Sequence, residues 1–281
     1  MKLTVLIENT APEGCGLCAE HGLSLHIEYR GKNILLDAGS SGSAMDNAKA
    51  LGIDISAVQF GVLSHGHYDH ADGFRRFFQE NDTAKVYLKQ GAECAYFSVS
   101  TGEPRFVGIH RELWQQERER FEQVTGKYQL SEGVWLIPQG HVAPEFASRE
   151  TSLLEKVAQD TFIPDTFCHE QSLVLEGERG LVVCNSCSHN GIINIVRTVK
   201  EQLQKPVYAV IGGLHLFSRT SESGMNCSED YVKVIADALI QEGVEQVYTG
   251  HCTGEQAFAL LKTYLGERLH PLFSGQVISI P

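Results

Sequence analysis

Runs of apolar residues divide the first third of the chain into strands and helices. Residues 3–9 and 24–39 are rich in β-branched and large apolar residues, and a polar Arg-Gly-Lys turn interrupts the second run, which predicts strands. Residues 41–52 have apolar positions at helical spacing between a serine and a glycine, which predicts a helix. A buried strand at 58–65 and a short helix at 73–80 are expected next.

The second half of the chain repeats this order of elements. Residues 171–191 resemble residues 23–42, because both contain a strand, a charged turn, a second strand and a loop of small residues. In each half a helix follows, in the second half at 191–203, and then an apolar strand that ends near a histidine, here at 207–215. A duplicated β-β-α-β arrangement predicts an α/β fold with two sheets face to face and helices outside.

The middle of the chain, from about residue 91 to residue 140, has a less regular pattern. It contains a charged helical stretch at 110–124 and a strand-like run at 134–140. We expect a single domain over residues 1–281, with an irregular insertion at about 91–170 as a candidate lid. Helices and strands alternate again at the end of the chain, at 228–243, 246–250, 255–266 and 276–280.

Composition and charge narrow the classes of partner. The 281 residues are 42% hydrophobic and 21% charged, which is enough apolar material for a large core. The formal net charge is −12 without a long block of lysine or arginine, so we expect no nucleic acid and no membrane as partner. The N-terminus lacks the pattern of a signal peptide, which favours a cytoplasmic protein with a small-molecule substrate. A homodimer stays open.

The eight cysteines include two C-x-x-C spacings. They pair Cys15 with Cys18 and Cys184 with Cys187. Either spacing can mark a metal or redox site, or it can be a coincidence of free thiols. The two pairs lie far apart in the sequence, and nothing near them resembles a zinc-ribbon knuckle, so coincidence is the favoured interpretation.

The segment VLSHGHYDHADG, residues 62–73, carries the strongest chemical signal. In an extended segment His65, His67 and Asp69 share one side, Gly66 lets the backbone bend, and His70 follows at the turn into the next helix. Imidazoles with a carboxylate suit zinc, iron or manganese. Since one small cation cannot easily bind four consecutive groups, the spacing favours two ions, with the first two histidines on one and the remaining pair on the other.

The same segment resembles the His-x-His-x-Asp-His signature of the metallo-β-lactamase superfamily. That family has an αββα sandwich of two β-β-α halves, in agreement with the repeat. The motifs ENTA, EHGLSLHIE, ILLDAG, CSHNGI, VIGGLHL and GHCTG extend the resemblance over essentially the whole chain, to one branch of the family. Members of that branch are labelled metal-dependent hydrolases or 7,8-dihydropterin-6-methyl-4-(β-D-ribofuranosyl)-aminobenzene-5'-phosphate synthase. Fold and motif do not fix the substrate.

The resemblance implies three further ligands: a mid-chain histidine, a bridging acid and a late histidine. His251, in GHCTG, matches the last motif. His189, in CSHNG, is the first choice for the mid-chain ligand, His141 is the second, and His169 is expected to be structural or at the surface.

The bridging acid is where this chain departs from the family pattern. The superfamily usually has an aspartate after the strand that here reads LVV, and this chain offers Cys187 instead. A thiolate can bind zinc, but a cysteine can also be a small buried side chain. Without a bridging carboxylate, fewer groups hold the second ion. We expect zinc, as one or two ions, with iron or manganese as alternatives.

Other polar groups complete the predicted site. His215, in GGLHL, lies at the strand end that corresponds to the histidine cluster in the repeat, which suggests substrate binding or proton transfer. Gly212 and Gly213 would let the backbone approach a ligand closely, and Asp37 would orient a ligand histidine. The branch pattern places two further residues at the pocket rim, Glu20 and His21.

The leading functional hypothesis is metal-assisted hydrolysis of an ester, phosphoester or amide. Asp69 would bind the metal and orient the nucleophile, while His215 would stabilise charge or protonate the leaving group. One alternative is transfer on the same metal site, with a pterin- or phosphoribosyl-type substrate. A second alternative is a di-iron redox or sensing protein, for which the chain lacks a flavin domain and an evident bridging acid.

Overall fold

The computed structural model describes residues 1–140 and 142–281, and these divide into two units by their internal contacts. The first unit contains Met1–Thr125, Leu153–His169 and Leu272–Pro281. The second unit contains Gly126–Ser152 and Glu170–Pro271. His141, the second choice for the mid-chain ligand, lies outside the described residues.

The first unit is built around a seven-stranded sheet with the order β18-β1-β2-β3-β4-β5-β8. Strands β2 and β3 form an antiparallel hairpin, and the strands from β3 to β8 run parallel to one another. The parallel strands end at one edge of the sheet, so the loops after them meet there. The bounds are β1 (Lys2–Ile7), β2 (Ser24–Tyr29), β3 (Lys32–Leu36), β4 (Phe60–Leu63), β5 (Lys85–Lys89), β8 (Phe121–Val124) and β18 (Val277–Ser279).

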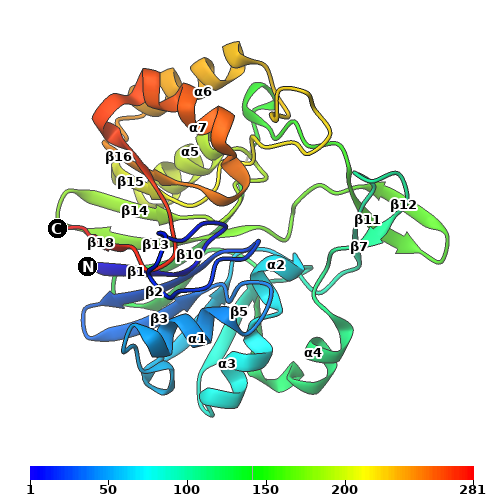
Figure 1. Cartoon of the computed structure of the whole chain (residues 1–281), viewed down its shortest axis with the longest axis vertical. Coiled ribbons are helices and arrows are strands. Elements are labelled where there is room, and N and C mark those ends of the chain that lie inside the picture. Colours follow the sequence, from blue (N-terminus) through cyan, green and yellow to red (C-terminus); the bar gives the residue numbers. More distant parts are fainter. Residues whose placement is uncertain (141) are drawn as a thin grey trace. The chain divides into compact units, whose positions relative to one another are not determined.

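Helices α1 (Ser43–Ala50) and α3 (Phe74–Glu80) pack on this sheet (Figure 1). Met45 of the first helix and Phe77 of the second belong to one buried cluster with Leu35 and other strand residues. Burying such side chains contributes roughly 1.5–3 kcal/mol each. The remaining helical segments of this unit are α2 (Tyr68–Ala71), α4 (Arg111–Gln116), η1 (Ile55–Ala57) and η2 (Arg118–Arg120).

The predicted helix at 110–124 is only half correct. Helix α4 ends at Gln116, and residues 121–124 form β8, which pairs in parallel with β5. The Phe121 ring lies 5.4 Å from the Phe78 ring and 5.3 Å from the Trp114 ring. These aromatic contacts and the strand pairing are tertiary, so they override the local helical pattern.

A small antiparallel sheet also belongs to the first unit, with the order β12-β11-β6-β7. Two of its strands lie in the segment from residue 91 to 140, and the apolar pattern does not predict them, because two or three residues are too short to show a period. The single domain and the lid stay predictions. The bounds are β6 (Tyr96–Ser98), β7 (Arg105–Phe106), β11 (Leu153–Ala158) and β12 (Thr161–Pro164).

The second unit has its own seven-stranded sheet, with the order β17-β16-β15-β14-β13-β10-β9. Strands β13 and β14 form an antiparallel hairpin, and the strands from β14 to β17 run parallel. This is the pattern of the first sheet, so the predicted repeat is present in the strand order. The bounds are β9 (Tyr128–Ser131), β10 (Val134–Pro138), β13 (Gln171–Gly177), β14 (Gly180–Cys184), β15 (Val207–Ile211), β16 (Gln246–Thr249) and β17 (Leu269–Pro271).

Three long helices lie together on the second sheet (Figure 1): α5 (Ile192–Leu203), α6 (Glu229–Gln241) and α7 (Glu255–Leu265). In α5 the buried Ile192, Val196 and Val199 recur at helical spacing, which explains its prediction from sequence. Ser228 accepts a hydrogen bond from Tyr231 N and so caps α6. The short helices are η3 (Pro144–Phe146), η4 (His251–Thr253) and η5 (Gly266–Arg268).

None of the helices in the described residues is both long and apolar enough to cross a membrane.

Gly73, directly before α3, is a position where the fold leaves no room for a side chain. A Cβ atom there would lie 1.9 Å from the carbonyl oxygen of Ala38 and 2.6 Å from that of Ser41. We expect Gly73→Ala to lower the free energy of unfolding by at least about 1–3 kcal/mol, the usual cost of overpacking. Urea unfolding measures it, with Gly126→Ala as control, since nothing lies within 4 Å of a Cβ there. Equal unfolding midpoints for the two variants would contradict the claim that position 73 has no room for a side chain.

Candidate functional site

The first donor group consists of the four residues predicted from the histidine cluster: His65, His67, Asp69 and His70. His65 and His67 lie in the loop after β4, Asp69 and His70 lie in α2, and each of the four is at most 8% exposed. The His65 ring lies 4.6 Å from the His67 ring and 4.4 Å from the His70 ring. Asp69 Oδ2 lies 3.5 Å from His70 Nε2. The structure thus brings all four together within the first unit.

The carboxylate of Asp37 contacts His70 directly and His65 through Ser64. Its fully buried carboxylate accepts hydrogen bonds from Ser64 N at 2.7 Å and Ser64 Oγ at 2.6 Å, and His70 Nδ1 lies 2.8 Å away. Because the Ser64 hydroxyl donates to Asp37, it accepts from His65 Nδ1, 2.8 Å away. We therefore assign the proton of both imidazoles to Nδ1, so that Nε2 has the lone pair a metal needs.

His67 is also held in the neutral form that binds metals. Burial, and then the neighbouring His169, lower the pKa of His67 to about 3. A metal site needs neutral imidazoles and ionised carboxylates. Three imidazoles and one carboxylate, with protein groups behind two of the rings, match the donor chemistry of zinc sites. The first donor group therefore fits a metal ion.

His169 supports the loop of the first donor group. Gly66 N donates to His169 Nδ1 at 3.0 Å, and His169 Nε2 lies 3.1 Å from Asp165 Oδ2. The ring also lies 4.1 Å from the Tyr96 ring. Both ring nitrogens are thus engaged by protein groups, which agrees with a structural role. Sequence analysis missed Asp165, because its role depends on a contact with a loop about a hundred residues earlier.

The two predicted rim residues have different surroundings. The Glu20 carboxylate accepts hydrogen bonds from Ser40 N at 3.0 Å, Ser41 N at 3.1 Å and Ser41 Oγ at 2.5 Å. Glu20 therefore organises the loop after β3. His21 Nε2 lies 3.3 Å from Asp69 Oδ2, and its side chain is 40% exposed. Of the two, His21 is the one that contacts the first donor group.

The second donor group lies in the second unit and consists of Cys187, His189, His215, His251 and Cys252. These residues follow the ends of β14, β15 and β16. The donor atoms of Cys187, His189 and His215 lie within 4.8 Å of one another, and so do those of Cys187, His251 and Cys252. Four of the five were predicted as site residues, and Cys252 was not.

Two glycines allow the loops of the second unit to pack closely. A Cβ atom on Gly212 would lie 1.9 Å from the Asn185 carbonyl oxygen, and one on Gly213 would lie 2.4 Å from Cys252 Sγ. Sequence analysis expected these glycines to make room for a ligand. In the structure they make room for backbone and for a sulfur atom of the chain itself.

Two histidines of this group have backbone conformations that are uncommon outside glycine. His215 has a φ of 50° and His251 a φ of 48°. Such residues persist where the surrounding structure over-determines them, and they cluster at functional sites. Here Asn226 Nδ2 donates to His215 O at 2.8 Å.

Glu170 is a site residue that sequence analysis missed. Its carboxylate, 1% exposed, accepts hydrogen bonds from His189 N at 2.7 Å and from Asn190 N and Nδ2 at 2.9 and 2.8 Å. It thereby fixes the backbone that carries His189. A glutamate just before a strand has no local signature of this role, because its partners lie about 20 residues later.

His215 is surrounded by groups that stabilise its charged form. Burial lowers the pKa of His215, but Cys252 and Glu150 outweigh it and raise the pKa to about 10. Glu150 Oε2 lies 3.5 Å from His215 Nε2. Burial raises the pKa of Glu150, but the neighbouring His215 and the hydrogen bond from Ser152 N lower it to about 2. A protonated imidazole suits the predicted role in charge stabilisation or proton transfer.

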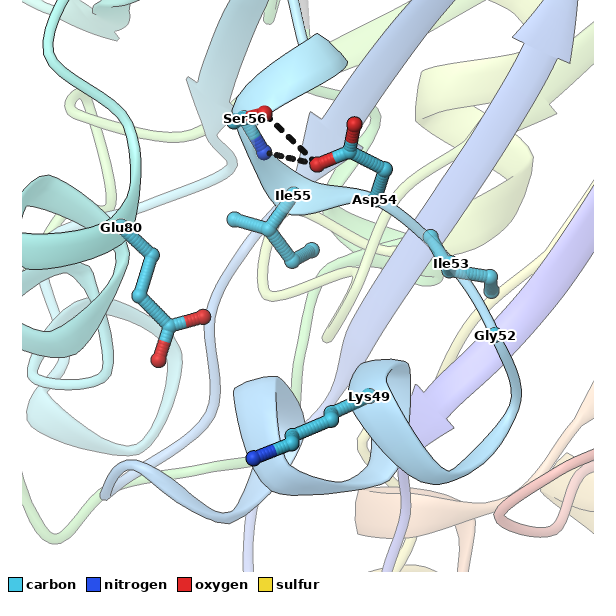
Figure 2. Close-up of a pocket in the computed structure, with 7 residues that line it drawn as sticks. All are labelled: Lys49, Gly52, Ile53, Asp54, Ile55, Ser56 and Glu80. Atoms are coloured by element: carbon cyan, nitrogen blue, oxygen red, sulfur yellow. Dashed lines mark hydrogen bonds between the residues drawn. The ribbon is translucent and has the colours of Figure 1, made fainter.

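Two cavities lie within the separate units. In the second unit His215, Ser188 and Tyr231 line a cavity of about 10 Å³, which is room for about one water molecule. In the first unit a depression of about 280 Å³ lies beside Lys49 and Asp54 (Figure 2). None of the predicted site residues lines this depression.

Comparisons with known proteins agree with the predicted family. Residues 20–129 match the family model described as Metallo-beta-lactamase superfamily. The chain is 29% identical over 295 residues to the 7,8-dihydropterin-6-methyl-4-(beta-D-ribofuranosyl)-aminobenzene-5'-phosphate synthase of Methanocaldococcus jannaschii, covering 99% of this chain and 96% of that protein.

Solved structures confirm the predicted fold class. The chain is similar to the crystal structure of Tm1679, described as a metal-dependent hydrolase of the beta-lactamase superfamily, with a TM-score of 0.82 and 27% identity. That similarity covers 100% of this chain and 99% of the other. A diphosphatase from the PhnP family, at a TM-score of 0.55 and 14% identity, supports the fold alone.

Asp37 offers a direct test of how the first donor group is oriented. We expect Asp37→Asn to weaken Zn²⁺ binding by about 10–100-fold, because the amide nitrogen would face Ser64 and His70 with a donor instead of an acceptor. Competition with a chromophoric chelator measures the affinity. Asp46→Asn, at an exposed position of α1, is the matched control. Unchanged affinity in Asp37→Asn would show that the carboxylate does not orient a ligand.

His169 offers a second test. In His169→Leu, the buried Gly66 N–H loses its acceptor, and Asp165 loses one of its two hydrogen-bond partners while it keeps Phe167 N. We expect a loss of about 1–3 kcal/mol in the free energy of unfolding, measured with urea. His110→Leu, at an exposed histidine of the same unit, should change it far less. If both variants unfold at the same urea concentration, the structural role is wrong.

Proposed function

We propose, from the membership of this chain in the metallo-β-lactamase superfamily, that it is a metal-dependent hydrolase acting on an ester, phosphoester or amide-type small molecule. The observation that carries the proposal is the first donor group, in which buried imidazoles and a carboxylate come together and Asp37 fixes the Nδ1 protons of His70 directly and of His65 through Ser64. Zinc, as one or two ions, fits these donors best, and iron or manganese are compatible with them.

The metal would supply a Lewis acid and a bound water that ionises near neutral pH. The chain's own residues do the rest. His65 and His70 hold their unprotonated Nε2 atoms in place, and His67 adds a neutral imidazole. Asp69, in contact with His70 and His21, offers an oxygen that can bind the metal or accept a proton from the nucleophile.

His215 is proposed as the acid of the reaction. Its raised pKa keeps a proton available at neutral pH, and Glu150 stabilises the charged imidazole. A cationic group of this kind can stabilise developing negative charge or protonate a leaving group.

Transfer instead of hydrolysis is the second candidate. The relative from Methanocaldococcus jannaschii is named a synthase, and it is similar over 99% of this chain. A pterin- or phosphoribosyl-type substrate would then react without attack by water. Product formation in ¹⁸O-labelled water separates the two candidates, since only hydrolysis places the label in the product.

The metal-binding assignment predicts the behaviour of a double variant. We expect His65→Ala combined with His67→Ala to purify without stoichiometric metal and to lose about 10³-fold or more of its hydrolytic rate on chromogenic ester, phosphodiester and lactone probes. Elemental analysis of protein from its native host measures metal content, and two irons per chain would instead favour the redox alternative. His110→Ala is the control. A double variant with full metal and full activity would end the proposal.

A further inference from the structure

The structure brings together two thiols that are far apart in the sequence, those of Cys187 and Cys252. Cys187 follows β14, while Cys252 lies in η4, 65 positions later. Their sulfur atoms and a ring nitrogen of His251 lie within 4.8 Å of one another, and all three residues are buried. We propose that Cys187 and Cys252 together form, with His251, a two-thiolate ligand set for a thiophilic metal ion in the second unit.

The C-x-x-C spacing around Cys187 points to the wrong partner. Cys184 lies inside β14, where its neighbours in the sheet are Leu173 and Ile211. Burial raises the pKa of Cys184 to about 12, which disfavours the thiolate that a metal needs. The thiol that lies beside Cys187 belongs to Cys252, a residue of the GHCTG motif, and not to Cys184.

The position of Cys252 is fixed by the backbone around it. Its carbonyl oxygen accepts hydrogen bonds from Leu216 N and Phe217 N, both at 3.0 Å. Its Sγ lies 3.6 Å from the carbonyl oxygen of Cys187, and a side chain at position 213 would collide with it. Protein contacts therefore hold the sulfur beside the Cys187 loop, which lowers the ordering cost of binding an ion there.

The distances are compatible with a tetrahedral ion. Zn–S bonds of about 2.3 Å and Zn–N bonds of about 2.0–2.1 Å put donor atoms roughly 3.3–3.8 Å apart, inside the 4.8 Å limit found here. Each thiol gives up its proton to solvent when it binds. Thiolates favour zinc, iron or copper(I) over manganese, magnesium and calcium, so this ligand set predicts a narrower choice of metal than the first donor group does.

A donor atom of His189 also lies within 4.8 Å of Cys187 Sγ, so His189 is the candidate for the fourth ligand, while His215 keeps its proposed role as the acid. Two thiolates with two imidazoles is a common donor set of structural zinc sites. The inference does not rest on the hydrolase assignment. Its experiment reads sulfur ligation instead of turnover, so either can fail without the other.

Cobalt(II) is a suitable probe, because thiolate ligands give a charge-transfer absorption in the near ultraviolet that imidazole and carboxylate ligands do not give. The full-length protein, reduced with a phosphine and freed of metal, is titrated with Co²⁺. We expect a band of two-thiolate intensity in the wild type, about half of it in Cys187→Ser or Cys252→Ser, and none in the double variant. Cys184→Ala, at the other cysteine of the motif, should leave the band unchanged.

A full band in Cys252→Ser, or none in the wild type, would overturn the proposal. So would loss of the band in Cys184→Ala alone. If a serine variant fails to fold by circular dichroism, X-ray absorption of the zinc-loaded wild type decides the matter. Two sulfur neighbours per ion at about 2.3 Å support the proposal, while one or none rejects it. If the ion is bound by nitrogen and oxygen atoms only, this inference fails, but the proposed metal-dependent hydrolase function is unaffected.

Discussion

The buried carboxylate of Asp37 is the interaction on which the first donor group depends. A charge without exposure to solvent is costly unless hydrogen bonds satisfy it, and here Ser64 supplies two donors and His70 supplies a third. Those bonds join the end of β3 to the loop after β4. They also decide which nitrogen of His65 and His70 is protonated. Local fold and site chemistry therefore rest on the same three contacts.

The same arrangement of strands serves both donor groups. In each sheet a hairpin is followed by parallel strands, and the polar residues stand just after the carboxyl ends of those strands. Loops at such an edge approach one another closely, which explains why glycines at 73, 212 and 213 have no space for a Cβ atom. Residues with a positive φ, which costs free energy outside glycine, occur in the same loops: Asp37, His215 and His251.

The apolar pattern was sufficient to predict the hairpins, the helices α1, α3 and α5 to α7, and the repeat, because these elements are long or strongly periodic. The cluster from His65 to His70 was visible because its donors are neighbours in sequence. What sequence could not predict depends on distant contacts. Residues 121–124 become a strand through pairing with β5, and Glu170 and Asp165 act on loops about 20 and 100 residues away. Cys252 was overlooked because it lies 65 residues after Cys187, and only the fold brings the two together.

The two donor groups differ in chemical hardness. The type of reaction and the choice of metal can therefore be considered separately, although the family resemblance suggests both at once. Imidazoles and a carboxylate accept zinc, iron or manganese, so the first group is compatible with hydrolysis by any of them. Thiolates at Cys187 and Cys252 would narrow the choice to thiophilic ions. The family's usual aspartate would not have this effect, since a carboxylate is a harder donor than sulfur. In the proposed site, Cys187 in place of the aspartate would change the metal preference, and Cys252 would supply the second thiolate. The second ion would then not need to be weakly held.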